Sequence, residues 1–295
     1  MKVLLTGASG FIGSKLTKRL ESAGHRVLPV SRRAGSGYDW SDDSLARGVR
    51  EADAVIHLAG ENLFVKRWSA RQKEILINSR KDSTMKLAAL VAARKPSCFI
   101  SSSAVGYYGP SETMRFNEDS PRGQDFLADL CGEWEAATEV AAMAGVRTAI
   151  VRTGVVLGMG GGALAKMLPP FKLGLGGPLG NGRQWVSWIH IDDLVSLFLF
   201  MLENPQASGA FNGTAPQPVS MKEFAKALGR ALHRPAIFPV PAPMLRLALG
   251  EVADILLTGQ HVEARRARET GFQFQFRDIE SALTDIVGNQ QGRKS

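Results

Sequence analysis

The stretch MKVLLTGASGFIG, residues 1–13, joins a short apolar strand to three glycines at positions 7, 10 and 13. A helical pattern follows at once over residues 14–23. In this arrangement Gly7 permits a tight turn, Gly10 lets a phosphate approach the backbone, and Gly13 lets the helix pack close to the strand. Backbone N–H groups and the positive end of the helix then hold a pyrophosphate. The glycines stand in the strand–turn–helix context that the motif requires, so the sequence predicts a dinucleotide site.

The composition limits the kinds of protein that this chain can be. The 295 residues suffice for one large α/β domain, or for one domain with a smaller lobe. A formal net charge of +8 favours anionic small molecules as ligands. The charge is not gathered into a basic block, except in the short tail Arg293–Lys294, so no nucleic acid is expected as a partner. Cys98 and Cys131 lack metal-ligand spacing, so free thiols and no metal site are expected.

The sequence also carries an expectation about location. The first strand begins at residue 2, which leaves no room for a signal peptide. The longest apolar run, near residues 194–202, is too short to span a bilayer. We therefore expect a cytoplasmic protein without membrane contacts.

Strand and helix patterns alternate along the first half of the chain. Strands are expected at VLLTG, HRVLPVSR, ADAVIHLAG, CFISSSA and RTAIVRTGVVLG, and helices at residues 14–23, 70–94 and 126–144. Residues 34–44 are expected to form a polar connection. This alternation predicts an α/β fold with a Rossmann-type, doubly wound parallel sheet, in which ligands bind beyond the carboxyl ends of the strands.

A second, smaller lobe is expected after residue 156, where glycines become frequent and prolines cluster near residues 235–243. The predicted Rossmann domain is 1–156, with returning segments at about 185–215. The predicted substrate lobe comprises 157–184 and 216–295.

Several motifs resemble those of the extended short-chain dehydrogenase/reductases, the superfamily of nucleotide-sugar epimerases and dehydratases. The matching pieces are TGASGFIG, DAVIHLAG, NSRKDSTMKL, SSSAVGYYG, RTGVVLG and WIHIDDL. The segment 158–184 and the tail HRPAIFPVPAPMLRLALGE are similar to one atypical NAD-dependent epimerase/dehydratase-like subgroup with a C-terminal domain of unknown function. That subgroup is described as cell-division-inhibitor-like and is related to the plant giant-chloroplast protein. The resemblance implies a fold and a cofactor but no particular reaction, because one fold hosts many functions.

The residues after the second strand bear on the choice between NAD(H) and NADP(H). NAD-preferring proteins place a carboxylate there for the ribose 2′-hydroxyl, whereas this chain has Ser31, Arg32 and Arg33. A hydroxyl and two guanidiniums suit a 2′-phosphate, so NADP(H) is the predicted cofactor. The other expected cofactor contacts are the three glycines with Ser9, Phe11, Ile12, Leu58, Ala59, Gly60, Ser101 and Arg152.

The catalytic signature that the resemblance implies is incomplete. Ser103 matches the serine that polarises the substrate carbonyl, with Ser102 as the alternative, and Asn78 matches an asparagine on the preceding helix. The superfamily's Tyr and Lys are absent, because Cys131 stands at the Tyr position and Glu135 at the Lys position. A thiol is a poorer hydrogen-bond donor than a phenol, and a nearby glutamate raises the pKa of a thiol.

Three interpretations of this loss stay open. In the first, Tyr107 or Tyr108 exchanges the proton, with His190 and two glutamates of the 126–144 helix as further candidates. In the second, Cys131 acts itself, although a cysteine on an apolar helix face is more often packed and inert. In the third, the protein binds NADP(H) without turnover, as a regulatory or division factor.

The substrate lobe supplies two candidate contacts, Arg183 and Trp185. Nucleotide-sugar enzymes carry an arginine two residues before the aromatic that opens the WIHIDDL motif, and Val186 occupies that position here. We therefore expect a different small molecule, with anions among the candidates. The predicted function is an NADP(H)-dependent oxidoreductase or epimerase-like enzyme acting on a carbonyl or secondary alcohol. The resemblance also implies a possible homodimer through the helices at 70–94 and 126–144.

Overall fold

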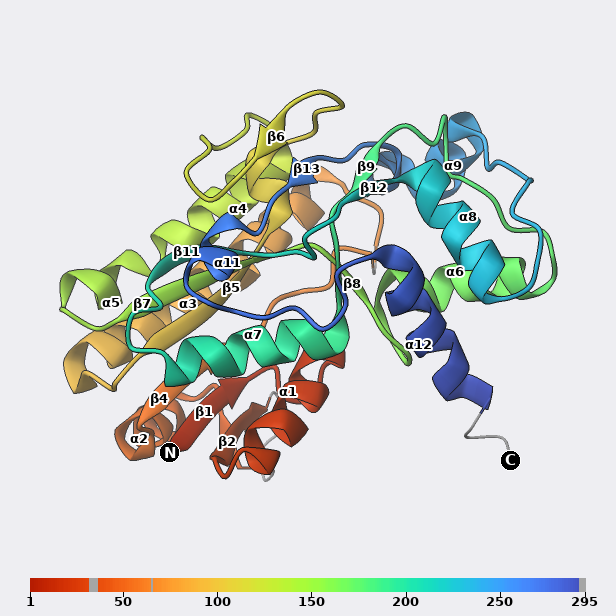
Figure 1. The fold of residues 1–295 in the computed structure, drawn as a ribbon. Coiled ribbons are helices and arrows are strands. Elements are labelled where there is room, and N and C mark those ends of the chain that lie inside the picture. The colour runs from red at the N-terminus through yellow and green to blue at the C-terminus, as the bar shows by residue number, and fades with distance from the viewer. Residues whose placement is uncertain (32–36, 65, 292–295) are drawn as a thin grey trace.

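A seven-stranded parallel sheet forms the centre of the computed structural model, which describes residues 1–31, 37–64 and 66–291 (Figure 1). Every neighbouring pair of strands in this sheet is parallel. The predicted Rossmann-type α/β fold is thereby confirmed. The strands, in spatial order, are β11 (Gly209–Gly213), β7 (Thr148–Thr153), β5 (Phe99–Ala104), β4 (Ala54–His57), β1 (Lys2–Thr6), β2 (Arg26–Ser31) and β3 (Tyr38–Asp39).

The strand order reverses between β1 and β4, which are neighbours in the sheet although β2 and β3 lie between them in sequence. Such a switch point opens a crevice at the carboxyl ends of the two strands, where dinucleotides bind in folds of this kind. The glycine turn after β1 opens into that crevice. The two residues expected to hold a 2′-phosphate, Arg32 and Arg33, lie outside the described residues.

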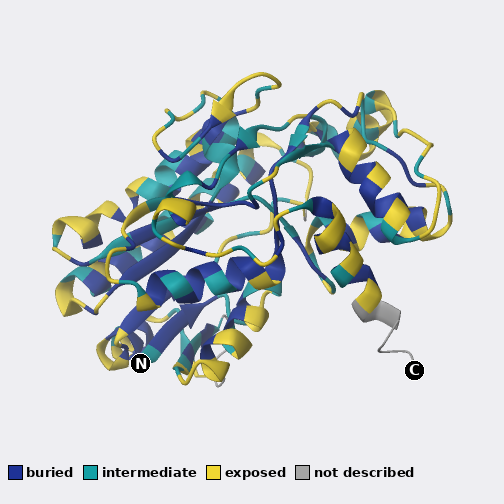
Figure 2. Ribbon diagram, viewed as in Figure 1, coloured by how far each residue is buried: buried dark blue, intermediate teal, exposed yellow. Residues whose placement is uncertain are grey.

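Helices cover both faces of the sheet (Figures 1 and 2). Strand residues alternate between the two faces, with Val3 and Leu5 in the core under the first layer and Leu4 in the core under the second. All three side chains are fully buried, so each layer stabilises the sheet by removing apolar surface from water. The first layer contains α1 (Phe11–Ser22) and α7 (Ile191–Glu203), and the second α2 (Asp42–Glu51), α3 (Ala70–Arg94), α4 (Phe126–Ala136) and α5 (Glu139–Met143).

The C-terminal lobe is built on its own apolar core. α6 (Gly162–Lys172), α8 (Met221–Ala231) and α12 (Ile279–Gln291) pack around Trp188, which is fully buried. Among the described residues, no helix combines the length and apolar character needed to cross a membrane. The remaining elements are η1 (Val105–Tyr108), β6 (Arg115–Phe116), β8 (Val155–Leu157), β9 (Trp185–Val186), β10 (Trp188–His190), β12 (Val219–Ser220), α9 (Ala242–Leu249), η2 (Gly250–Ala253), α10 (Asp254–Leu257), β13 (His261–Val262) and α11 (Arg265–Glu269).

Two expected elements are interrupted. The helix expected over 126–144 ends at Ala136 and resumes at Glu139, and the Thr138 hydroxyl donates to the Glu135 carbonyl at 2.7 Å. Side-chain bonds of this kind compete with regular helix. The strand expected at RTAIVRTGVVLG divides at Gly154, where a Cβ would lie 2.2 Å from the Ser187 carbonyl oxygen. This close approach lets β8 leave the main sheet and pair with β10.

The close contact between α1 and the glycine turn makes a prediction. A Cβ at Gly13 would lie 2.1 Å from the Gly7 carbonyl oxygen and 2.8 Å from the Ala8 Cα, so Gly13→Ala has to displace backbone. We expect it to lower the free energy of unfolding by roughly 3 kcal/mol or more. Gly288→Ala in α12 is the control, because nothing lies within 4 Å of its Cβ position and alanine favours helix. Urea denaturation of both variants measures the difference, and equal stabilities would contradict the close packing.

Candidate functional site

The glycine turn forms a cradle at the positive end of α1. Gly7 has a φ of 71°, and a Cβ there would lie 3.0 Å from the Leu58 backbone. Gly10 is the N-cap of α1 and offers no capping side chain, and the first turn holds no acidic residue. The N–H groups at this helix end are therefore open to an anion. The cradle fits a dinucleotide pyrophosphate on these grounds.

Phe11 links the cradle to the C-terminal lobe. Its ring is the nearest group to the Cβ positions of Gly161, at 2.6 Å, and it also approaches those of Gly158 and Gly162, at 3.1 Å. Side chains at these glycines would push the ring away. Phe11 and Ile12 are partly buried and pack against the core under α1 and α7. Their side chains therefore serve packing, whereas Ser9 is exposed in the turn.

A buried network fixes the end of β4 beside the cradle. The Thr6 hydroxyl accepts hydrogen bonds from the N–H groups of Leu58 at 3.1 Å and Ala59 at 3.2 Å, and bonds His57 Nδ1 at 2.7 Å. His57 Nε2 bonds the Thr84 hydroxyl at 3.0 Å. Burial, with a contribution from the Arg80 charge, lowers the pKa of His57 to about 3. His57 is therefore a neutral structural residue that positions the Leu58–Gly60 segment.

Arg80 is a site residue that the sequence analysis missed. Its guanidinium donates to the carbonyl oxygens of Leu76 at 3.0 Å and Glu61 at 2.7 Å, lies over the Trp134 ring, and approaches the Cβ position of Gly60. Its Nε is buried without a hydrogen-bond partner. Burial lowers the pKa of Arg80, and the nearby Cys131 and Glu61 oppose this only in part. An unpaired buried cation is costly, so this position favours an anionic ligand group.

The structure places Asn78 away from the buried side of α3. Asn78 is exposed, and it lies two residues before the buried Arg80, on the opposite side of α3. The side chains that α3 directs inward near the site are Leu76, Arg80 and Thr84, at intervals of four residues. That spacing was the available signal for Arg80.

Ser103 meets a buried ion pair. Ser103 and Arg152 are opposite each other in the register of β5 and β7. The Ser103 hydroxyl donates to Glu135 Oε1 at 2.6 Å, and Arg152 binds both oxygens of the same carboxylate, at 2.9 and 2.8 Å. Burial alone would lower the pKa of Arg152, but the hydrogen bonds and charge of Glu135 outweigh it and the pKa is raised. The carboxylate at the expected lysine position is thus neutralised by a guanidinium.

Arg152 was expected to contact the cofactor, but its guanidinium is bound by other protein groups instead. Its remaining nitrogen, Nη1, donates to the Tyr108 hydroxyl at 3.0 Å and to the Glu118 carbonyl oxygen at 3.3 Å. The face of its guanidinium lies 3.4 Å from the centre of the Tyr107 ring. Because each guanidinium nitrogen has a protein partner, Arg152 positions the site.

The two tyrosines differ in environment. Tyr108 is buried and donates to Asn212 Oδ1 at 2.7 Å, and burial raises its pKa to about 12. The Tyr108 hydroxyl hydrogen is held in the hydrogen bond to Asn212, and the raised pKa opposes its release. The structure therefore does not support Tyr108 as the group that exchanges a proton. Tyr107 is only partly buried and stacks on Arg152, which leaves it the candidate of the two.

Cys131 is fully enclosed beside Ser103. Burial, and next the charge of Glu135, raise the pKa of its thiol to about 12. The neutral thiol is a poor nucleophile, so catalysis by Cys131 is not supported. Ser101 is also buried, with its hydroxyl donating to the Ser102 carbonyl oxygen at 3.3 Å.

The candidate substrate residues lie together at the edge of the lobe. Arg183 is exposed, with Nε 3.7 Å from a Glu112 carboxylate oxygen, and Trp185 Nε1 donates to the Glu112 carbonyl oxygen at 2.8 Å. The Trp185 ring meets His261 edge-on. Glu112 thus partly neutralises Arg183. No group of three or more metal-ligating side chains occurs in the described residues.

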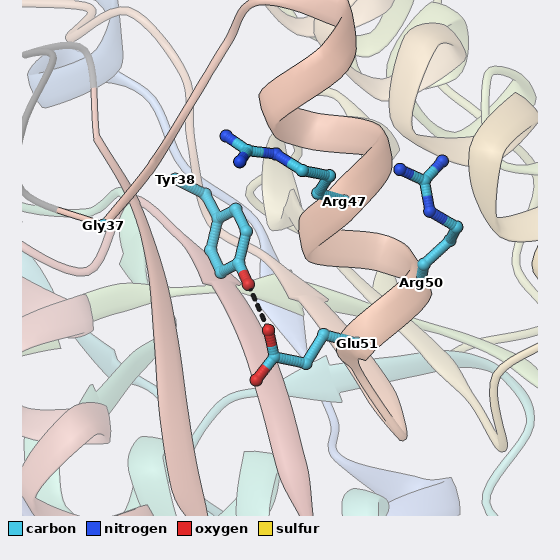
Figure 3. A pocket seen from close by; sticks show the side chains of 5 residues that line it. All are labelled: Gly37, Tyr38, Arg47, Arg50 and Glu51. Carbon is cyan, nitrogen blue, oxygen red and sulfur yellow. Dashed lines mark hydrogen bonds between the residues drawn. The ribbon is translucent and has the colours of Figure 1, made fainter.

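A shallow depression elsewhere on the surface has a different character. It is lined by Gly37, Tyr38, Arg47, Arg50 and Glu51, with Tyr38 donating to Glu51 (Figure 3). Glu51 also pairs with Lys2, the first residue of β1. Tyr38 pairs with Val30 near the end of β2, so the depression runs along the outer edge of the sheet, beside β3 and α2.

Comparisons with known proteins agree with this geometry. The model of the NAD dependent epimerase/dehydratase family matches residues 3–212, and that of a domain of unknown function, DUF1731, matches residues 240–286. The epimerase family protein SDR39U1 of Mus musculus is 45% identical over 294 residues, which cover 97% of this chain and 100% of the relative. The chloroplastic SDR39U1 homologue of Arabidopsis thaliana is 43% identical, over 97% of this chain and 87% of the relative.

Solved structures extend the likeness to the whole fold. Human SDR39U1 (isoform 2), crystallised with NADPH, has a TM-score of 0.93 and 40% identity, covering 98% of this chain and 100% of that one. A nucleoside-diphosphate sugar epimerase from Corynebacterium glutamicum has a TM-score of 0.80 and 33% identity, covering 98% of this chain and 58% of that one.

The ion pair beside Ser103 predicts strong coupling between its partners. Glu135→Met or Arg152→Met each leaves a buried charge without a partner, so each is expected to destabilise the fold by about 3–5 kcal/mol. The double variant removes both charges and should lose clearly less than the sum of the two losses. Urea denaturation of the four proteins completes the cycle, and additive losses would show that the pair does not form.

The environment of the thiols makes a separate prediction. Cys98 and Cys131 are both buried with raised pKa values, so neither is expected to react with iodoacetamide at pH 8 in the folded protein. Both should react fully in denaturant, which serves as the control. Intact-mass spectrometry counts the labels, and rapid labelling of Cys131 in the native state would contradict its enclosure.

Proposed function

Because the chain belongs to the NAD dependent epimerase/dehydratase family, we propose that it is an NADP(H)-dependent enzyme acting on a carbonyl or secondary alcohol. The observation that carries the proposal is the uncapped α1 terminus over Gly7, Gly10 and Gly13, at the same sheet edge as Ser103. The cofactor found with the human relative supports NADPH as its occupant.

We assign the cofactor's phosphates to two positively charged or polarised parts of the site, the α1 cradle and the surroundings of Arg80. The α1 cradle takes the pyrophosphate, since its backbone N–H groups are open and its positive dipole faces the anion. Arg80 adds a buried positive charge beside the Gly60 backbone; it acts at a distance, because its Nε is enclosed by protein and its other two nitrogens donate to carbonyl oxygens. Ser31, at the end of β2, and the two arginines after it are proposed to select the 2′-phosphate.

Ser103 and Glu135 are proposed to handle the proton. When bound, the nicotinamide supplies or accepts a hydride. Ser103 donates its own proton to Glu135, so toward a ligand its Oγ is a hydrogen-bond acceptor. A substrate hydroxyl can therefore give its proton to Ser103 Oγ while the Ser103 proton moves to Glu135 Oε1. The reverse movement returns the proton to a carbonyl oxygen.

A silent NADPH-binding protein is the second candidate. Cys131, at the Tyr position, is enclosed and neutral, and Glu135, at the Lys position, is held by Arg152. These contacts favour a regulatory or division factor that has kept the cofactor but lost the reaction.

The cofactor assignment predicts a selective loss. Replacing Arg32 and Arg33 together by Ala should weaken NADPH binding by about tenfold or more and leave NADH binding nearly unchanged, because only NADPH carries the 2′-phosphate. Lys18→Ala and Arg19→Ala, on the exposed side of α1, form a charge-matched control. Titration of cofactor fluorescence gives both affinities, and equal losses for the two cofactors would defeat the assignment.

The reaction itself is tested by deuteride transfer. The protein is incubated with a cell metabolite extract and NADPH deuterated at C4, on each face in turn, and products are read by mass spectrometry. We expect a labelled metabolite with the wild-type protein, and about a 100-fold slower transfer with Ser103→Ala. Ser102→Ala is the control, since adjacent strand residues point to opposite faces. Intact NADPH binding without any label would favour the silent candidate.

A further inference from the structure

Two segments about 60 residues apart in sequence lie side by side at the outer end of the C-terminal lobe. The Phe238 N–H donates to the Gly176 carbonyl oxygen at 3.1 Å, and the Val240 N–H donates to that of Pro178 at 3.0 Å. Arg234 Nε donates to the Lys172 carbonyl oxygen at 3.1 Å. The segments 172–178 and 234–240 therefore run in parallel, and they form the edge of the lobe farthest from the sheet (Figure 1).

Large apolar side chains stand exposed along this edge. The exposed fractions are 75% for Leu173, 58% for Leu175, 69% for Ile237 and 49% for Phe238. Single exposed apolar residues are ordinary, but here four of them lie on two segments that pair with each other. We call these four residues the apolar edge. Their exposure is costly in water and points to a partner that covers them.

Basic side chains border the apolar edge. A shallow depression beside it is lined by Lys226, Arg230, His233 and Arg234, and by Ile237 of the edge itself. Lys172 is exposed at the start of the first segment. No Asp or Glu occurs between residues 140 and 191 or between residues 224 and 250. Arg230 pairs with Glu280 of α12 and Glu223 interacts with the charge of Lys226, so the border has two carboxylates beside the cations Lys172, Lys226, Arg230 and Arg234 and keeps a net positive charge.

We propose that the apolar edge and its basic border dock on an anionic lipid surface. The four apolar side chains would enter the interface, and the cations around the depression would meet headgroup phosphates. A second copy of the chain is a poor occupant, because a symmetric contact would place the same basic border against itself. A projecting edge also suits a broad interface better than the enclosed groove that a peptide helix needs.

This contact differs from the expectation drawn from the sequence. Neither segment contains a long apolar run or helical periodicity, and the four residues of the apolar edge come together only through the pairing of the two segments. The proposal concerns peripheral binding, in which no part of the chain spans the bilayer. It does not depend on the proposed reaction.

Vesicle sedimentation tests the proposal. The full-length protein should pellet with phosphatidylglycerol vesicles, stay in solution with phosphatidylcholine vesicles, and be released at about 0.5 M NaCl, where charges are screened over a few ångströms. Failure to pellet with phosphatidylglycerol, or equal pelleting with both lipids, would overturn the proposal. Failure to pellet would also direct attention to an acidic protein partner.

Paired variants locate the contact. Leu175→Ser with Ile237→Ser should weaken partitioning by about tenfold or more, because two apolar side chains lose their transfer into the interface. Lys172→Gln with Lys226→Gln should weaken it by about tenfold through lost attraction to phosphates.

Met143→Ser is the matched control. Met143 is 79% exposed on α5, at the opposite end of the molecule. This variant should bind vesicles like the wild type. NADPH binding by every variant reports that the fold is intact. Wild-type partitioning by both edge variants, or an equal loss in Met143→Ser, would place the lipid contact elsewhere and refute the proposal.

Discussion

The buried ion pair between Glu135 and Arg152 determines the arrangement of the site. It joins α4 to β7, orients the Ser103 hydroxyl of β5, and leads through Tyr108 to Asn212 of β11. Each charge would be costly to bury alone, and the bidentate geometry with added hydrogen bonds offsets that cost. Three strands and a helix therefore depend on the same two side chains.

The sequence predicted most of the sheet and failed where tertiary contacts override local pattern. The helix at 70–94 is confirmed at both ends, because Ser69 caps it and Lys95 leaves it in a left-handed conformation. Residues 34–44 were expected to form a polar connection, yet the described part of this stretch contains β3 and the start of α2, since Leu45 and Val49, four residues apart, are enough to anchor a short helix. The return of β8 toward β10 depends on the close approach of Gly154 to Ser187, which no local pattern encodes.

Part of the candidate site was likewise predictable from the sequence, and part was not. The cradle was predictable because its glycines are adjacent in sequence and each meets a local backbone requirement. The partners of Ser103 were not, because Glu135 and Arg152 come from a helix and a strand whose register only the fold sets. Arg80 was predictable as the charged member of a series of inward-facing residues spaced by four, Leu76, Arg80 and Thr84, whereas the asparagine of the resembling family pointed to the neighbouring Asn78.

Electrostatics explains how the chain can lose a Tyr–Lys pair without losing a dinucleotide site. A lone carboxylate at the lysine position would repel the cofactor's phosphates. Arg152 neutralises the Glu135 carboxylate with Nε and Nη2, and its third nitrogen, Nη1, donates to the Tyr108 hydroxyl. Arg80, on a different helix, keeps an unpartnered nitrogen and its positive charge. The site thus keeps positive charge beside the α1 cradle, although the chain has Cys131 and Glu135 where a Tyr–Lys pair would stand.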